Sequence, residues 1–150
     1  MRRMPRAAGG TMITDTGVVY ASMDRSDPSH AACVELLQRI GDPLVIPSPV
    51  LIELDWLGDA RGVPVLDVTL ASVENGSIEV IDLSPTDYTR IRELCRQYQD
   101  LGLGMVDASV VAVAERLGEE TIATLDHRHF SVVRPRHLAS FTLVPDAPVR

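Results

Sequence analysis

The sequence predicts an α/β fold in which helices cover both faces of a mostly parallel central sheet, giving a three-layer α/β/α sandwich. Two observations support this prediction. Short apolar segments with strand character alternate along the chain with longer segments whose apolar residues recur every three or four positions. Parallel neighbours also need a crossover connection, which is usually a helix. At 150 residues, 45% of them hydrophobic, the chain is long enough for one domain with its own core.

The first half of the chain carries clear start and stop signals. Pro28 follows the polar break after the first helical pattern, and Gly41 ends the next helix. Pro49 suits the first turn of the helix that follows the second strand. The elements expected in this half are a strand at 12–15, helices at 18–24 and 30–40, a strand at 44–46, and helices at 48–60 and 64–74.

The second half repeats the alternation. Ser84 and Pro85 are typical of a helix start, and Gly118 is typical of the residue just after a helix end. The segment between Met105 and Gly118 is the most apolar helical pattern in the chain. The elements expected here are a strand at 78–83, helices at 85–99 and 105–118, and strands at 121–126 and 141–144.

Composition excludes several classes of protein. A net charge of −7 argues against binding nucleic acid through overall basicity, so any such contact must be local. Cys33 and Cys95 are too few and too isolated for a disulfide framework and indicate reduced core residues in a cytoplasmic protein. No apolar run has the length of a signal peptide core or a membrane span. We expect residues 1–11 to form a disordered leader and residues 12–150 to form a single domain.

Four acidic residues occupy positions where sheets of this type bind ligands, beyond the carboxyl ends of the strands. Asp15 ends the first strand, Glu53 lies about one turn into the helix after the second strand, Asp107 lies in the first turn of the apolar helix, and Asp126 follows the strand at 121. Most other acids are expected on solvated helix faces or ends, among them Glu35, Asp87, Glu93, Glu115, Glu119 and Glu120.

The surroundings of these four acids point to a cation. Glu53 and Asp107 lie within apolar segments, where an unpartnered charge is costly. Carboxylates brought together raise one another's pKa values and either keep protons or gather a cation. A donor set of oxygens without His or Cys suits Mg²⁺ or Mn²⁺ better than zinc. Taken singly, each acid also has an ordinary explanation, as a turn residue or as a first-turn residue favoured by the helix dipole.

The sequence resembles the PIN-domain ribonucleases, and specifically the VapC-type toxins of toxin–antitoxin pairs. The resemblance runs from about Met12 to Val144 and rests on "ITDTGVVYASMDRSDPSH", "IPSPVLIELDWL", "GLGMVDASVVAVAERLG" and "TIATLDHRHF" in that order. It implies a PIN fold and Mg²⁺- or Mn²⁺-dependent endonuclease cleavage of RNA by metal-activated water. It also implies inhibition by a cognate VapB-type antitoxin, and a homodimer.

Carried over residue by residue, the acidic site of the family falls on Asp15, Glu53, Asp107 and Asp126, with Asp15 and Asp107 as the strongest metal ligands and Asp126 as the most variable. Hydroxyl groups near these acids can orient them; the candidates are Thr14, Thr16 and Thr124. The segment Trp56–Leu57 and residues 63–70 are candidates for an antitoxin groove or for ordinary core.

The basic segment "HRHFSVVRPRH", residues 127–137, has two interpretations. Its arginines and histidines can contact RNA phosphates, or it is a surface loop in which Phe130 packs inward. The residues concerned are Arg128, Arg134, Arg136, His127, His129 and His137. A zinc site built from these histidines is improbable, because no HExxH-like motif accompanies them.

Two alternatives to a nuclease share features with this sequence. The tripeptide Asp15-Thr16-Gly17 also occurs in aspartic proteases, but those enzymes are all-β, and helices alternate with strands here. The stronger alternative is a catalytically silent PIN-like module that only binds RNA or an antitoxin. The intact acidic set argues against that module.

Overall fold

The structure is a computed structural model that describes residues 12–41 and 43–147. The leader expected at residues 1–11 lies outside this range. The elements are β1 (Ile13–Thr14), α1 (Thr16–Met23), α2 (His30–Ile40), β2 (Leu44–Pro47), α3 (Ser48–Arg61), α4 (Val65–Glu74), β3 (Ile78–Ile81), α5 (Pro85–Gln97), the 3₁₀ helix η1 (Gln99–Leu101), α6 (Met105–Leu117), β4 (Thr121–Ala123), α7 (His127–Phe130) and β5 (Thr142–Val144).

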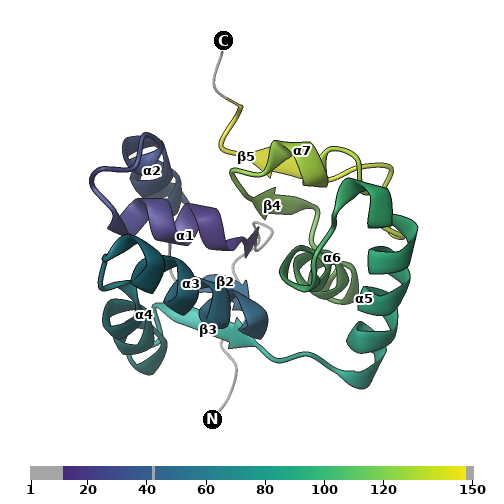
Figure 1. The fold of residues 1–150 in the computed structure, drawn as a ribbon, viewed down its shortest axis with the longest axis horizontal. Helices are drawn as coiled ribbons and strands as arrows, with labels where there is room; N and C mark the ends of the chain where they lie inside the picture. The colour runs from purple at the N-terminus through teal and green to yellow at the C-terminus, as the bar shows by residue number, and fades with distance from the viewer. Residues whose placement is uncertain (1–11, 42, 148–150) are drawn as a thin grey trace.

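The central sheet confirms the predicted α/β/α architecture. Its five strands have the order β3-β2-β1-β4-β5, and each neighbouring pair is parallel. Helices α1 to α4 lie on one side of the sheet, and α5 and α6 pack together on the other (Figure 1). Because β1 lies between β2 and β4, the order of connections reverses at β1, which is where such sheets bind ligands.

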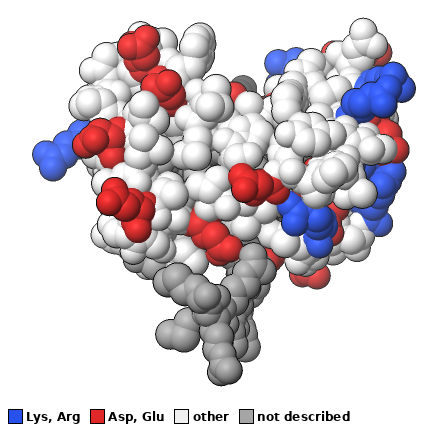
Figure 2. All heavy atoms as spheres, turned by 90° about the horizontal axis from the view of Figure 1, so that it is seen from below, with Lys and Arg blue, Asp and Glu red and all other residues white. Residues whose placement is uncertain are grey.

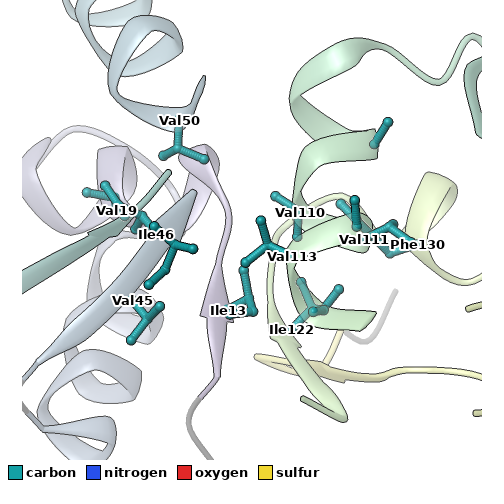
Figure 3. Close-up of a cluster of buried hydrophobic side chains, with 14 of the residues drawn as sticks. Ile13, Val19, Val45, Ile46, Val50, Val110, Val111, Val113, Ile122 and Phe130 are labelled. Carbon is teal, nitrogen blue, oxygen red and sulfur yellow. The ribbon is translucent and has the colours of Figure 1, made fainter. Parts of the chain in front are cut away.

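The main core is built from β-branched residues of the central strands and of α6. Ile13, Ile46 and Ile122 are fully buried on three adjacent strands. Val110 and Val113 of α6 approach this surface from one side, and Val19 and Val50 lie beyond the strands on the other (Figure 3). This burial fixes the register of β1, and with it the position of the residue that follows β1.

Several helix ends match the signals in the sequence. Ser84 and Asp87 form a reciprocal capping box at the start of α5, with Pro85 in the first turn. Gly62 and Gly118 adopt left-handed conformations just after α3 and α6. No helix among the described residues is long and apolar enough to cross a membrane.

The structure corrects three expectations. The strand expected at 121–126 ends at Ala123, because the chain turns there and Asp126 caps the short helix α7. That helix occupies part of the segment expected to be a loop. Asp87 and Glu119, expected to be solvated, are buried. For Asp87 the reason is its bonding, since it completes the capping box and forms an ion pair with Arg116 at 2.9 Å.

Candidate active site

Four segments bring the predicted acids to the carboxyl end of the sheet. Asp15 follows β1 directly and caps α1, and Asp126 follows β4 and caps α7. Glu53 lies in α3, which begins immediately after β2, and Asp107 lies in the first turn of α6. Each acid therefore occupies the type of position that the sequence predicts for it.

Asp15 is held rigidly in a buried position and is only 5% exposed. Its Oδ1 atom accepts a hydrogen bond from the backbone N–H of Thr16 at 2.8 Å. Its Oδ2 atom accepts one from the Thr124 hydroxyl at 3.0 Å, so one of the three threonines expected to orient the acids does so with its side chain. Burial, followed by the charge of Asp107, raises the pKa of Asp15 to about 7 despite these hydrogen bonds, with Glu53 adding to the rise.

Asp107 is linked electrostatically to the other acids. Burial and then the charge of Asp126 raise the pKa of Asp107 to about 6, and Glu53 contributes in the same direction. His129 opposes this rise. The acids therefore interact as a coupled group in which charge accumulates, as the sequence predicts for a site that gathers a cation.

His129 lies between two of the acids and was missed in the sequence analysis as a member of this site. Its Nδ1 atom is 2.5 Å from Asp126 Oδ2 and 3.4 Å from Asp107 Oδ2. Its backbone N–H also donates to Asp126 Oδ1 at 3.1 Å. The available signal was the spacing of Asp126 and His129, three residues apart, which places both side chains at one short helical turn.

The donor set fits a divalent ion. One ligand atom from each of Asp107, Asp126 and His129 lies within 4.8 Å of the other two. Asp15 and Glu53 are not part of this tightest group but act on it electrostatically. The hydroxyl of Thr16, a residue next to Asp15 that is only 2% exposed, has no hydrogen-bond partner among the described residues. An unpartnered buried hydroxyl beside an acidic site is consistent with a ligand or water that completes it.

Most basic side chains of the 127–137 segment bond to other groups of the protein. This leaves fewer of them to contact RNA phosphates. His127 contacts the Pro145 carbonyl at 2.9 Å, and His137 contacts the Glu119 carbonyl at 2.7 Å. Arg134 donates to the Ser131 carbonyl, and Arg136 forms an ion pair with Glu93. Phe130 is fully buried, as the alternative interpretation expected.

Arg128 differs from the other cationic residues of this segment. It is exposed, and no ion pair or hydrogen bond of its side chain is found within the described part of the chain. The distribution of basic side chains is also uneven, since on the face shown in Figure 2 they gather mainly on the side that carries α5 and α6.

An apolar groove of about 710 Å³ adjoins the acids. Ile52 and Trp56 of α3, 75% and 69% exposed, line it together with Tyr88 and Met105 on the opposite wall. Glu53 also lines the groove, so the groove and the acidic group share a residue. Of the antitoxin candidates, Trp56 is in this groove, whereas Leu57 packs against the core and Val65 is buried in it.

Comparison with known proteins decides the family. The model of the PIN domain family matches residues 12–134. The chain belongs to the PIN domain family. A relative in Mycobacterium tuberculosis, ribonuclease VapC26, is 36% identical over 135 residues, which cover 89% of this chain and all of the relative. The resemblance to PIN-domain toxins of the VapC type is therefore confirmed.

Solved PIN-domain structures agree with the fold. Mycobacterium tuberculosis VapC20, described as a sarcin-ricin loop cleaving toxin, matches with a TM-score of 0.66 and 18% identity, over 75% of this chain and 87% of that one. The FitAcB structure from Neisseria gonorrhoeae matches with a TM-score of 0.63 and 15% identity, over 89% and 96% of the two chains. VapBC2 from Rickettsia felis, bound to a DNA fragment from its promoter, matches with a TM-score of 0.58 and 19% identity, over the same shares.

Proposed function

We propose that this PIN-domain protein is a Mg²⁺- or Mn²⁺-dependent endoribonuclease that acts as the toxin of a toxin–antitoxin pair. The observation that carries the proposal is the convergence of four acids, distant in sequence, where burial and then the charges of neighbouring acids raise the pKa values of Asp15 and Asp107. Structural packing alone gives no reason to bring mutually repelling carboxylates together around the buried Asp15. The same arrangement in an enzyme holds a divalent ion against a phosphate.

Each residue of the proposed site has a distinct task. Asp15, Asp107 and Asp126 supply oxygen atoms for the ion, and Glu53 supplies further negative charge at the side of the groove. Thr124 and the start of α1 hold the Asp15 oxygens in a fixed orientation. When bound, a divalent ion activates water for attack on a phosphodiester and neutralises charge on the departing oxygen.

RNA binding by this acidic protein requires local positive charge. Among the described residues, no ion pair or hydrogen bond of the exposed Arg128 side chain is found, and Arg128 follows Asp126 by two positions. We propose that Arg128 contacts a phosphate of the substrate, which makes binding weaker as salt rises.

The apolar groove is the proposed docking surface for a VapB-type antitoxin. An apolar segment of the antitoxin fits the walls formed by Ile52, Trp56 and Tyr88. Because Glu53 lies in the same groove, a segment bound there is positioned to place an arginine beside the acids and replace the charge of the ion. The homodimer implied by the resemblance is also proposed, and sedimentation velocity over a range of protein concentrations tests it.

Removal of one site carboxylate tests the nuclease. We expect Asp107→Asn to abolish RNA cleavage while the fold is retained, because the ion loses a central ligand. Mn²⁺ at one hundred times its Kd stabilises a protein that binds it by about 2.7 kcal/mol. The melting temperature of the unmodified protein should therefore rise with Mn²⁺, and that of Asp107→Asn should not.

Asp67→Asn, at an exposed position on α4, is the matched control and should keep both properties. Undiminished cleavage by Asp107→Asn would remove that residue from the site. Absence of both cleavage and Mn²⁺ stabilisation in the unmodified protein would favour the alternative, a silent binding module.

A further inference from the structure

The ring of His129 is anchored on the side away from the acids. Its Nε2 atom lies 3.1 Å from the Leu101 carbonyl oxygen, at the end of η1. A carbonyl oxygen only accepts hydrogen bonds, so Nε2 carries the hydrogen in this contact. Gly102, in a left-handed conformation, ends η1 there, and the Leu101 N–H is bonded to Tyr98. The anchor is therefore a fixed part of the backbone.

This anchor directs the second ring nitrogen at the acidic group. In the neutral ring with hydrogen on Nε2, the Nδ1 lone pair faces Asp126 Oδ2 and Asp107 Oδ2, at 2.5 Å and 3.4 Å. Histidines that ligate metals very often donate their other ring N–H to a backbone carbonyl or a carboxylate, which fixes the tautomer and the ring orientation. His129 has that arrangement.

The three donor atoms are grouped closely enough for one ion to lie among them once the 2.5 Å contact between Nδ1 and Asp126 lengthens. Ligand atoms at about 2.0–2.2 Å from a small divalent ion are separated by roughly 3 Å when adjacent and by roughly 4 Å when opposite. The Asp107, Asp126 and His129 donors all lie within 4.8 Å of one another. Without an ion, the short contact between Nδ1 and Asp126 Oδ2 requires a hydrogen between these two atoms, in addition to the one on Nε2. An ion bound among the three donors would take the place of that hydrogen.

We propose that Nδ1 of His129 ligates the divalent ion together with Asp107 and Asp126, so that the site has one nitrogen donor beside its carboxylates. This inference rests on the proposed metal-dependent function, and it differs from the expectation of a donor set without histidine. Imidazole nitrogen suits Mn²⁺ and later transition metals better than Mg²⁺, which prefers oxygen ligands. The site should therefore prefer Mn²⁺ over Mg²⁺.

Pulsed electron paramagnetic resonance on the Mn²⁺-loaded protein tests this ligand directly. We expect ¹⁴N modulation from a coordinated imidazole, which changes to the ¹⁵N pattern when the protein is made with ¹⁵N-labelled histidine. His129→Ala should lose the modulation and bind Mn²⁺ about 10- to 100-fold more weakly, with a smaller loss for Mg²⁺. His127→Ala and His137→Ala are the controls, since both rings contact backbone carbonyls away from the acids, and both should keep the signal.

The outcomes separate this ligand from the wider proposal. If Mn²⁺ binds and RNA is cleaved but no nitrogen coupling is detected, His129 is not a ligand, and the nuclease proposal stands. If coupling persists in His129→Ala, another histidine is the ligand and the inference is overturned. If the protein does not bind Mn²⁺, both proposals fail together.

Discussion

At the scale of single residues, Asp15 combines a structural role with a chemical one. As the cap of α1 it accepts the first N–H of the helix, and as a buried acid its pKa is raised to about 7. The folded state therefore holds the Asp15 proton more tightly than the unfolded state does. A raised pKa of this kind contributes stability below the unfolded pKa, and this contribution is lost as pH rises towards 7.

This linkage predicts a stability gain on removing the charge. In the presence of a chelator, the free energy of unfolding of Asp15→Asn relative to that of the unmodified protein should be about 2–3 kcal/mol higher at pH 8 than at pH 5. Urea denaturation at the two pH values measures the effect. Asp67→Asn is the control, and its effect on the free energy of unfolding should be the same at pH 5 and pH 8. A deficit for Asp15→Asn that is the same at pH 5 and pH 8 would show that its capping role outweighs its charge.

Sequence alone located the four acids but not their surroundings. The acids were predictable because strand ends and first helical turns can be recognised from local patterns. The ion pair of Arg136 was not predictable, because its partner Glu93 lies on α5, 43 residues earlier in the chain. His129 was missed for a similar reason, since the Leu101 carbonyl that orients its ring belongs to η1, which no sequence pattern predicted.

At the scale of elements, the junction of α3 and α4 shows how tightly the helices approach. The N–H of Val63 bonds to the Gly58 carbonyl at 2.9 Å, which closes the end of α3 after the left-handed Gly62. A Cβ atom on Gly58 would lie 2.6 Å from Val65 Cγ2 and 2.7 Å from the Val63 carbonyl oxygen. The helical pattern predicted both helices, but not that their junction requires glycine inside α3.

Substitution of Gly58 tests this approach. Gly58→Ala should lower the free energy of unfolding by about 1–3 kcal/mol, because the backbone must shift to admit the methyl group. Gly17→Ala is the matched control within α1, where the added atom would meet Leu125 at ordinary contact distances of 3.7 Å and more. That change should be neutral or slightly stabilising in the same denaturation experiment. Equal stability of the two variants would contradict the close approach.

At the scale of the whole molecule, the acids and the apolar groove form one continuous surface. Glu53 belongs to both, since it lies on α3, directly after the exposed Ile52 and three residues before the exposed Trp56. A partner bound in the groove therefore lies beside the acidic group that we propose as the active site. This arrangement allows one binding event to block the enzyme without any change in its fold.

A charge placed in the groove should weaken binding of the antitoxin. We expect Ile52→Glu to weaken binding of the cognate antitoxin at least tenfold, measured by calorimetry, because a carboxylate must be desolvated against the apolar segment. Val132→Glu, at a residue that is 47% exposed and outside the groove, is the control and should bind normally. Unchanged affinity of Ile52→Glu would assign the antitoxin to another face.

The order of the segments along the chain also matters during translation. Thr124 and Asp15, which share a hydrogen bond, are 109 residues apart, and the Thr124 N–H is bonded in turn to the Val144 carbonyl of the last strand. In a nascent chain the four acids therefore cannot come together until nearly the whole chain has left the ribosome. Under the proposed function, an incompletely translated toxin, or one truncated by a premature stop codon, has no assembled acidic site and is harmless to the cell that makes it.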